Sequence, residues 1–481
     1  MNPAAVDPSY GILIGGEHRC ATASFEVEDP ATWEVVAHVT DGGAADALAA
    51  VDAAAEAAGS WRSCAPRDRA AVLHHAYALM RDRAESLADL IALENGKSRA
   101  DALAEVSYAG DFLRWYAEEA VRSSGSYGPS PGGGTRTIVT QLPIGVAALV
   151  TPWNFPAAMV TRKVAPALAA GCTAVLKPAA ETPLTALAIA ELLADAGLPA
   201  GVVNVVPTTD PGAVVGQWLG DRRVRKISFT GSTAVGKVLL RQAAERVVAS
   251  SMELGGNAPF VVTEDADVDA AVRGALVAKF RNGGQACTAA NGFFVHAAIA
   301  ERFTEQFCAA AARLRIGPAA TGADLGPVIS ARAVDRLDEL VEDALARGAR
   351  LRYRADLSAD RGWFVPPTVL THVDRTATLY REEIFGPVAP IVTWEDEAAL
   401  LEELNQDDLG LAAYVYSGDL QRAVRFAEAL EVGMVGINRG VVSDPSAPFG
   451  GVKESGLGRE GARAGIEAFQ ESRYLSVDWP D

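Results

Sequence analysis

The chain has 481 residues, of which 49% are hydrophobic, and a formal net charge of −18 at pH 7. This length exceeds the range over which one hydrophobic core keeps growing, so we expect two or more domains. The excess of acidic residues disfavours nucleic acid and anionic membranes as partners, because both require concentrated positive charge. An anionic ligand would need local arginines to attract it against this overall field.

The cysteines and histidines show no spacing typical of a disulfide framework or a metal site. The five cysteines form no C-x-x-C pair, and the six histidines form no H-E-x-x-H pattern. Residues 1–10 lack a basic region followed by an apolar core, and no apolar run approaches the roughly 20 residues of a membrane span. We therefore expect a soluble, cytoplasmic protein without a metal.

The first third of the chain predicts small strands, then long helices, then an exposed strand. Short apolar runs predict edge strands at 12–14, 25–27 and 35–39. Helical periodicity predicts helices over 44–58, 67–94 and 100–122, the last with Phe112, Trp115 and Tyr116 in the core. The turn-rich segment 123–134 then leads to an exposed strand at 136–142.

From Ile144 onward, apolar strands alternate with helices. The expected strands are 146–151, 173–177, 202–206 and 226–229, and the helices between and after them are 157–169, 184–196, 213–219 and 234–247. Strands separated by crossover helices predict a parallel sheet covered on both faces. The pattern repeats in a second α/β unit, with helix 268–279, strand 292–296 and helices 298–313 and 331–346, and a strand at 472–477 ends the chain.

The candidate chemistry centres on Cys287, in the loop F-R-N-G-G-Q-A-C-T-A-A-N. A free cysteine has a pKa of about 8.5, so its surroundings must favour the nucleophilic thiolate. Glu253, in M-E-L-G-G-N-A-P, is a carboxylate among apolar and glycine neighbours that could act as a base. Asn154, in T-P-W-N-F-P, offers an amide donor, and nucleophile, base and donor together are what acyl chemistry requires. The alternatives are a buried small cysteine, a structural hydrogen bond at Glu253 and a turn cap at Asn154.

In their order and separation, these three segments resemble the aldehyde dehydrogenase superfamily. The resemblance continues with F-T-G-S-T-A-V-G at 229–236, E-E-I-F-G-P at 382–387 and P-F-G-G-V-K-E-S-G-L-G-R-E at 448–460. It implies an α/β fold with a Rossmann-type parallel-sheet cofactor domain, a second α/β catalytic domain and a β-hairpin oligomerisation arm. The corresponding ranges are 1–122 with 143–252, 253–445, and 123–142 with 462–481. The last strand would pair within the arm or across the subunits of a homodimer or homotetramer.

The resemblance also implies NAD(P)-dependent oxidation of an aldehyde to a carboxylic acid. The Cys287 thiolate would attack the aldehyde, and the Asn154 amide with the Cys287 N–H would bind the oxyanion that forms. Hydride would then leave for the nicotinamide, and water activated by Glu253 would hydrolyse the thioester. The alternatives from other classes are a cysteine hydrolase, which would need a histidine beside Cys287, and a non-catalytic structural protein.

Cofactor contacts follow from the same resemblance. Gly231 and Gly236 fall where a strand ends and a helix begins, so backbone N–H groups there could hold a pyrophosphate, although G-x-G-x-x-G is absent and a tight turn is the simpler interpretation. In the family this turn, with Ser232, contacts the pyrophosphate. The other implied cofactor contacts are Thr151, Pro152, Trp153 and Leu254, Lys177 at the adenosine ribose or its phosphate, and Glu383 at the nicotinamide ribose with Phe385 near the ring.

One departure from the family bears on the choice between NAD and NADP. Relatives that prefer NAD carry a glutamate three residues after the lysine, whereas this chain has Ala180 there and Glu181 one place later. Without that carboxylate a 2′-phosphate is not repelled. We therefore expect NADP, with NAD as the alternative if Glu181 turns inward.

The finer resemblance is to the succinate-semialdehyde dehydrogenase branch, through K-F-R-N-x-G-Q-x-C, T-R-K and G-L-G-R-E-G. In that branch two arginines and a serine hold the distal carboxylate, and they map onto Arg162, Arg281 and Ser443. Guanidinium groups suit this task because they match a carboxylate in bidentate fashion. Succinate semialdehyde is therefore the expected substrate.

Other substrates stay open. Glutarate semialdehyde is one methylene longer, and a methylene is worth only ~1–3 kcal/mol in discrimination. An uncharged aldehyde would be favoured if Arg162 belongs to a solvated helix face and Arg281 to a loop ion pair. Asp444 would oppose an anion if it pointed inward. Ala289 stands where many relatives carry a second cysteine, so we expect no disulfide switch at Cys287.

Overall fold

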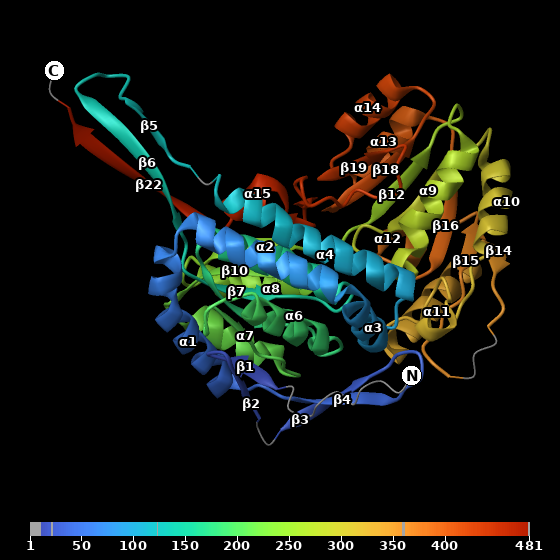
Figure 1. The fold of residues 1–481 in the computed structure, drawn as a ribbon. Helices are drawn as coiled ribbons and strands as arrows, with labels where there is room; N and C mark the ends of the chain where they lie inside the picture. The colour runs from blue at the N-terminus through green and yellow to red at the C-terminus, as the bar shows by residue number, and fades with distance from the viewer. Residues whose placement is uncertain (1–10, 21–22, 123, 358–360, 480–481) are drawn as a thin grey trace.

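Two α/β units lie side by side, and a narrow three-stranded sheet extends away from them (Figure 1). The computed structural model describes residues 11–20, 23–122, 124–357 and 361–479. The N-terminal segment 1–10, from which we expected no targeting signal, lies outside the described residues. Among the described residues, no helix has both the length and the apolar character that a membrane crossing demands.

The first unit is built on an eight-stranded sheet whose five central strands are parallel. Across the sheet these are β9 (Val203–Val205), β8 (Thr173–Lys177), β7 (Val146–Val150), β10 (Val224–Thr230) and β11 (Ala249–Glu253). Numbered along the chain, this order is 3-2-1-4-5, the doubly wound order of Rossmann-type folds. After β9 the chain crosses to the other side of β7 to form β10, so the order in which strands are added reverses between β7 and β10. Antiparallel strands flank the sheet: β1 (Ile12–Ile14), β2 (Glu17–Arg19) and β21 (Gly456–Leu457).

Helices cover both faces of this sheet, because its strands are apolar on both sides. They are α1 (Ala44–Ser63), α2 (Pro66–Asp82), α3 (Ala84–Asn95), α4 (Arg99–Ala120), α5 (Pro156–Ala170), α6 (Pro183–Asp195), α7 (Pro211–Gly220) and α8 (Thr233–Ala244). Every residue of α5 is buried. Proline begins α2, α5, α6 and α7, where the missing N–H would have no intrahelical partner.

The prediction of one continuous helix over 67–94 is wrong. Arg83 lies between α2 and α3, and its backbone angles (φ −101°, ψ 16°) are outside the helical region. The resulting bend lets Glu94 of α3 accept hydrogen bonds from the N–H groups of Leu184 and Thr185 at the start of α6. This long-range cap is invisible to local periodicity, which continues through the break.

The second unit contains a seven-stranded sheet with the same 3-2-1-4-5 order in its core. Across it lie β16 (Val388–Trp394), β13 (Ala290–His296), β12 (Ala258–Val262), β18 (Ala412–Tyr416) and β19 (Met434–Ile437), all parallel, and β15 (Thr368–Thr371) and β14 (Arg350–Arg354) extend one edge. The described helices around it are α9 (Val268–Phe280), α10 (Ala300–Ala311), α11 (Ala331–Ala346), α12 (Thr378–Arg381), α13 (Glu397–Asn405) and α14 (Leu420–Ala429). Phe260 packs toward α9 and α10, whereas Val261 packs toward α11 and α14, so alternate residues of β12 build opposite layers.

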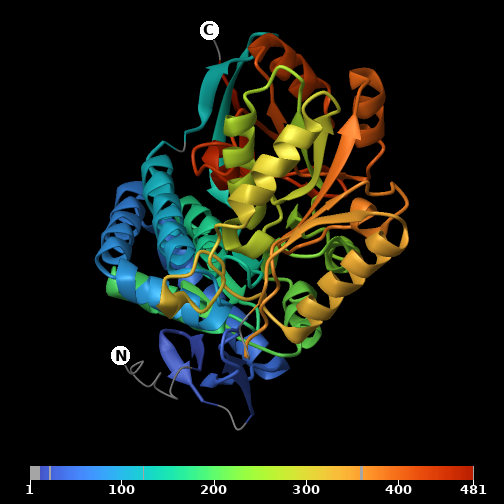
Figure 2. The ribbon, with the colours of Figure 1, turned by 90° about the vertical axis from the view of Figure 1, so that its right-hand side faces the viewer.

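The projecting sheet consists of β5 (Ser126–Pro129), β6 (Thr135–Pro143) and β22 (Gln470–Asp478). The last strand pairs with β6 along its whole length, from Gln470 opposite Pro143 to Asp478 opposite Thr135. This confirms the hairpin and the first of the two pairings expected for the terminal strand. Figure 1 shows the sheet standing off the body, next to the short helix α15 (Ala462–Glu467), and in the turned view of Figure 2 its strands reach the top of the molecule. Two small pairs complete the fold: β3 (Ser24–Glu28) with β4 (Val35–Thr40), and β17 (Leu409–Gly410) with β20 (Val452–Lys453).

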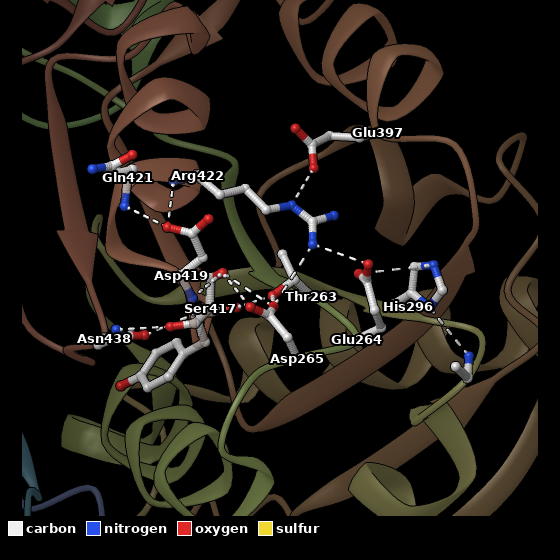
Figure 3. A network of polar contacts seen from close by, with 12 residues as sticks. Thr263, Glu264, Asp265, His296, Glu397, Ser417, Asp419, Gln421, Arg422 and Asn438 are labelled. Carbon is white, nitrogen blue, oxygen red and sulfur yellow. Dashed lines mark hydrogen bonds and ion pairs between the residues drawn. The ribbon is translucent and has the colours of Figure 1, made fainter.

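A polar network occupies the carboxyl ends of β12 and β18, between which the strand order of the second sheet reverses (Figure 3). Arg422 lies at its centre, with Nε 2.6 Å from Glu397 Oε2 and Nη1 3.0 Å from Glu264 Oε1. Ser417 Oγ donates to Asp265 (3.1 Å), and Asp419 caps the start of α14. Each of these side chains has a protein partner.

Candidate active site

A cavity of about 270 Å³ lies where the carboxyl ends of the first sheet face the amino ends of the second. Its walls come from the loops after β7 and β10, from the loop before β13 and from residues 443–449. Ligands of doubly wound sheets bind outside the carboxyl ends of the strands, at the point where the strand order reverses. The loops after β7 and β10 stand at that point in the first sheet.

The cysteine loop is held in a shape that depends on its glycines. After α9, Asn282, Gly283 and Gly284 all adopt left-handed backbone angles, with φ of 53°, 61° and 77°. A Cβ at Gly284 would lie 2.3 Å from the carbonyl oxygen of Gly386, so only glycine fits there. A Cβ at Gly256 would likewise lie 2.7 Å from the carbonyl oxygen of Cys287. The backbone of Gly256 therefore approaches Cys287 closely, and that of Gly386 approaches the loop just before it.

Hydrogen bonds tie Asn154 to this loop. The Asn154 side-chain amide donates to the Gln285 carbonyl (3.0 Å), and the Asn282 amide donates to the Asn154 carbonyl (2.8 Å). The Asn282 N–H in turn donates to Asp101 of α4 (2.9 Å). Since one amide proton of Asn154 is used by Gln285, the second is free for a ligand, and Asn154 Oδ1 is buried without a partner.

A buried ion pair that the sequence did not reveal supports Asn154 from behind. Lys97 Nζ lies 2.5 Å from Glu105 Oε2 and also donates to the Asn154 carbonyl (2.8 Å). Glu105 Oε1 accepts from the N–H groups of Ala157 and Ala158, at the N-terminus of α5. Both charged side chains are fully buried. The pair thus fixes the start of α5, which directly follows the loop that carries Asn154.

The electrostatics around Cys287 favour the neutral thiol. Burial, and next the Glu383 carboxyl, raise the pKa of Cys287 to about 12, while Arg162 and Arg281 act in the opposite direction. The two guanidinium groups are therefore close enough to the sulfur to influence it. Because the thiol is protonated at neutral pH, it must lose its proton before it can act as a nucleophile.

Glu253 ends β11 with its carboxyl group buried beside the cavity. The residue is 3% exposed, and neither carboxyl oxygen has a hydrogen-bond partner. A Cβ at Gly450 would lie 2.8 Å from Glu253 Oε1, so glycine leaves room for the carboxyl group. Burial, and next the Glu460 carboxylate, raise the pKa of Glu253 well above its ordinary value. A carboxyl group of this kind can accept a proton near neutral pH.

The three residues expected to bind a carboxylate, Arg162, Arg281 and Ser443, all line the cavity with Cys287. The Arg162 guanidinium lies over the Phe449 ring, 4.0 Å from its centroid, and that of Arg281 lies over Phe155 at 5.3 Å. Within the described ranges, Arg281 has no acidic side chain within ion-pair distance of 4.0 Å. Its positive charge is therefore available to a ligand.

Asp444 does not oppose an anion in this cavity. Its side chain is exposed and accepts hydrogen bonds from the N–H and hydroxyl of Ser446 (2.9 and 2.7 Å), and it is absent from the cavity wall. These hydrogen bonds hold the carboxylate in its own turn. The concern that Asp444 faces the substrate is thereby removed.

The residues present fit a dinucleotide at the reversal point of the first sheet. Gly231 and Ser232 line the cavity at the start of α8, and Ser232 Oγ accepts from the Val235 N–H as its N-cap. The residue Thr230 is also on the cavity wall, and its Oγ1 is buried without a partner, so a polar group of a ligand could form a hydrogen bond with it. Phe385 packs edge-on against Trp153, 5.5 Å between ring centroids.

Glu383 and Lys177 are the two ionisable residues expected at the riboses of the dinucleotide. The Gly256 N–H donates to Glu383 (3.4 Å), and burial raises the pKa of Glu383 to about 8. Lys177 ends β8 at 8% exposure, and burial lowers its pKa, an effect that the nearby Glu181 partly offsets. Ala180 lies between Lys177 and Glu181 in the chain, and Glu181 is exposed.

The structure brings together most of the predicted site residues. Those on the cavity wall are Pro152, Trp153, Asn154, Arg162, Gly231, Ser232, Leu254, Arg281, Cys287, Glu383, Phe385 and Ser443. Those outside the wall are Thr151, Lys177, Ala180, Glu181, Gly236 and Glu253. Gly236 serves packing, because a Cβ there would lie 2.5 Å from Leu254 Cδ2.

Several cavity residues were missed by sequence reasoning, among them Tyr108, Phe155, Met159, Thr230, Thr288 and Phe449. Phe155 and Phe449 stand inside the quoted motifs T-P-W-N-F-P and P-F-G-G, so a search of aromatic residues beside candidate groups would have found them. Tyr108 lies one helical turn before Phe112, on the helix face already assigned to the core. Its position gave no sign that it reaches a cavity.

A Rossmann-type sheet that faces a cysteine, an amide and a buried carboxyl group is the arrangement of a dinucleotide-dependent enzyme. The sequence matches the aldehyde dehydrogenase family over residues 18–475, and the chain belongs to that family. This confirms the predicted fold and NAD(P)-dependent aldehyde oxidation.

Named relatives are similar over nearly the whole chain. A succinate-semialdehyde dehydrogenase of Escherichia coli (strain K12), whose name specifies NADP(+), is 47% identical over 97% of each chain. A glutarate-semialdehyde dehydrogenase of Pseudomonas putida is 47% identical over 94% of each. The crystal structure of a succinate-semialdehyde dehydrogenase from Burkholderia pseudomallei has a TM-score of 0.97 and 46% identity, covering 99% of this chain and 100% of that one.

Proposed function

We propose that this enzyme oxidises succinate semialdehyde to succinate with NADP, through a thioester on Cys287. The observation that carries the proposal is that Arg162, Arg281 and Ser443 line the same cavity of about 270 Å³ as Cys287. Two guanidinium groups facing a nucleophile favour a short aldehyde with a carboxylate at its far end. The names of two similar proteins, a succinate- and a glutarate-semialdehyde dehydrogenase, agree with this class of substrate.

In the proposed reaction, the Cys287 thiol loses its proton to solvent, and the sulfur then forms a bond to the aldehyde carbon. The free amide proton of Asn154 and the Cys287 N–H stabilise the oxygen that becomes negative. NADP, when bound, supplies the acceptor for the hydride that leaves this carbon. Water then adds to the thioester carbon and gives one of its protons to Glu253. The carbon–sulfur bond breaks to release the acid and the Cys287 thiolate, which takes up the proton that Glu253 held.

The residues that would hold the dinucleotide lie at and around the point of reversal of the first sheet. Gly231 and Ser232 would bind its pyrophosphate through backbone N–H groups at the start of α8. Lys177 would lie at the adenosine ribose and its 2′-phosphate, where Ala180 contributes no carboxylate to repel the phosphate. Glu383 would bind the nicotinamide ribose, and Phe385 would lie near the nicotinamide ring. The further cofactor contacts would be Thr151, Pro152, Trp153 and Leu254.

Glutarate semialdehyde is the second candidate substrate, because one similar protein is named for it and one methylene changes binding little. A broad-specificity enzyme for uncharged aldehydes is less favoured, since it would leave the Arg281 charge in the cavity without a ligand partner. A cysteine hydrolase is disfavoured as well, because no histidine is among the described residues of the cavity wall.

The test is steady-state absorbance of reduced nicotinamide, with succinate semialdehyde, glutarate semialdehyde and butanal, each with NADP and with NAD. We expect a kcat/KM at least tenfold higher for the carboxylated substrates, about 1.4 kcal/mol of transition-state binding, and a preference for NADP. Arg281→Ala should abolish the preference for carboxylated substrates. An equal or higher kcat/KM for butanal would overturn the substrate assignment.

We further propose a cytoplasmic location and, from the projecting sheet, a homodimer or homotetramer. Tyr127, Tyr474 and Leu475 on its strands are 64%, 58% and 44% exposed, an apolar surface that a second subunit would cover. Light scattering that gives the mass of a monomer would contradict this assembly.

A further inference from the structure

We propose that the Tyr108 hydroxyl donates a hydrogen bond to the distal carboxylate of the substrate, next to the Arg162 guanidinium. This inference rests on the proposed function, since it concerns how the same cavity recognises a carboxylated aldehyde. It adds to the two arginines a neutral donor that lies outside every motif used to predict the site.

Tyr108 reaches the cavity from the middle of α4. Its side chain is on the cavity wall, and its hydroxyl oxygen accepts a hydrogen bond from Arg162 Nη2 at 2.5 Å. A phenol oxygen that accepts this bond keeps its own proton for a second partner. Among the described residues, no protein acceptor for that proton is found, so a ligand oxygen in the cavity could take it.

Contacts on several sides hold the Arg162 guanidinium beside Tyr108. The guanidinium is 4.0 Å from the Phe449 ring centroid and 5.2 Å from that of Phe112, and Arg162 is 2% exposed. Its Nη1 faces Glu460 Oε2 at 3.8 Å. These contacts leave the guanidinium little freedom to turn toward a different partner.

One donor of this guanidinium has no partner. Arg162 Nε is buried and makes no hydrogen bond to the protein. In an arginine side chain, Nε–H and Nη2 lie on the same edge of the guanidinium plane, and Nη2 is the atom bound to Tyr108. Nε–H and the Tyr108 hydroxyl are therefore neighbouring donors, a spacing that suits the two oxygens of one carboxylate.

An unpaired Nε–H deep in the protein would be costly unless a ligand completes it. An uncharged aldehyde offers no acceptor at its far end, whereas a carboxylate offers two oxygens. The pair of donors therefore acts on the choice of substrate and has no direct part in the reaction at the aldehyde carbon.

The experiment compares Tyr108→Phe with the wild-type enzyme, using succinate semialdehyde and butanal with NADP. Phenylalanine keeps the ring that packs 4.9 Å from Phe112 and removes only the hydroxyl. We expect kcat/KM for succinate semialdehyde to fall 10- to 100-fold, mainly through KM, and kcat/KM for butanal to change less than twofold. The inhibition constant of succinate should rise by a similar factor.

Tyr77→Phe is the matched control, because the Tyr77 ring also lies against an arginine, Arg114 at 5.6 Å, but stands outside the cavity wall. It should leave the constants for both substrates unchanged. A fall of less than threefold for succinate semialdehyde in Tyr108→Phe, or an equal fall for both aldehydes, would overturn the inference.

A double-mutant cycle separates direct donation from positioning of Arg162. If Tyr108 donates to the substrate, Tyr108→Phe still raises the succinate inhibition constant in an Arg162→Met background. If the effect vanishes there, Tyr108 acts only through Arg162, and the direct hydrogen bond is refuted. Failure of the proposed function itself is distinguishable, because the wild-type enzyme would then show no preference that Arg281→Ala could remove.

Discussion

The two sheets share the strand order 3-2-1-4-5, yet their points of reversal are used in opposite ways. In the first sheet, the loops after β7 and β10 open onto a cavity with Cys287 on its far wall. In the second sheet, the carboxyl ends of β12 and β18 are closed by the network around Arg422 (Figure 3). The same topology therefore provides a binding site in one unit and a closed surface in the other.

The difference lies in which polar groups have partners. Around the cavity, Asn154 Oδ1, Arg162 Nε, Thr230 Oγ1 and both carboxyl oxygens of Glu253 are buried and unpaired. At the second point of reversal, Arg422 is shared among acidic side chains. Because unpaired buried polar atoms are uncommon, their concentration marks the place where a ligand supplies the missing hydrogen-bond partners. Strand order alone does not make a site.

The largest effect we expect is on stability, from the ion pair behind the cavity. Lys97→Met leaves Glu105 buried without its cation, so the free energy of unfolding should fall by about 3–5 kcal/mol in urea denaturation. Lys237→Met breaks an ion pair to Glu454 in which both side chains are more than 40% exposed, and it should change the free energy by less than about 1 kcal/mol. Equal effects of the two substitutions would refute the supporting role of Lys97.

A slightly smaller effect is expected on catalysis, from the amide that faces Cys287. Asn154→Ala removes one donor to the negative oxygen, so kcat should fall by about 10²- to 10³-fold. Stopped-flow absorbance of the reduced nicotinamide measures this step, and thermal unfolding checks that the loop still folds. A loss below tenfold would mean that Asn154 only holds Gln285 in place.

Much of this architecture could be predicted from the sequence, because strand and helix periodicity is local. β12 was nevertheless missed, since Pro259 lies within a central strand, where proline is unusual. A shift of register between Ala258 and Pro259 against β13 accommodates it. The remaining elements after residue 347 likewise lacked the clean alternation of the first sheet.

The parts of the site that escaped prediction are contacts between distant residues. Lys97 and Asn154 are 57 positions apart, and Tyr108 and Arg162 are 54 apart. Nothing in the local pattern distinguishes Lys97 from an ordinary loop residue or Tyr108 from an ordinary helix residue. By contrast, Cys287 and Asn154 stand in loops that contain glycine or proline, and Glu253 directly precedes such a loop. Their grouping could be anticipated, although their roles stay proposals.

The third prediction concerns pH. With a pKa of about 12, the thiolate fraction of Cys287 should increase tenfold for each pH unit between 7 and 10. Alkylation by iodoacetamide in the absence of cofactor, followed at the Cys287 peptide by mass spectrometry, should rise with the same slope and show no plateau. In the urea-unfolded chain, the same peptide should plateau above about pH 9, because an ordinary thiol is then ionised. A plateau near pH 7 in the folded enzyme would contradict the neutral thiol.

The smallest effect should come from the closed point of reversal. Arg422 is 21% exposed and its partners Glu264 and Glu397 about 40%, so solvent screens these ion pairs. Arg422→Met should lower the free energy of unfolding by about 1 kcal/mol and leave kcat and KM unchanged within twofold. A tenfold loss of kcat/KM would show that this surface takes part in function and would break the comparison.

The most direct test of the central claim is to stop the enzyme after the first half of its reaction. Glu253→Gln keeps the size and shape of the side chain but removes the carboxylate that accepts a proton from water. Mixed with NADP and succinate semialdehyde, this variant should release about one equivalent of reduced nicotinamide per active site and then stall, with an acyl group on the Cys287 peptide in mass spectrometry. Steady turnover without a burst, or a burst with no adduct on Cys287, would contradict the assignment of Cys287 as nucleophile and Glu253 as base.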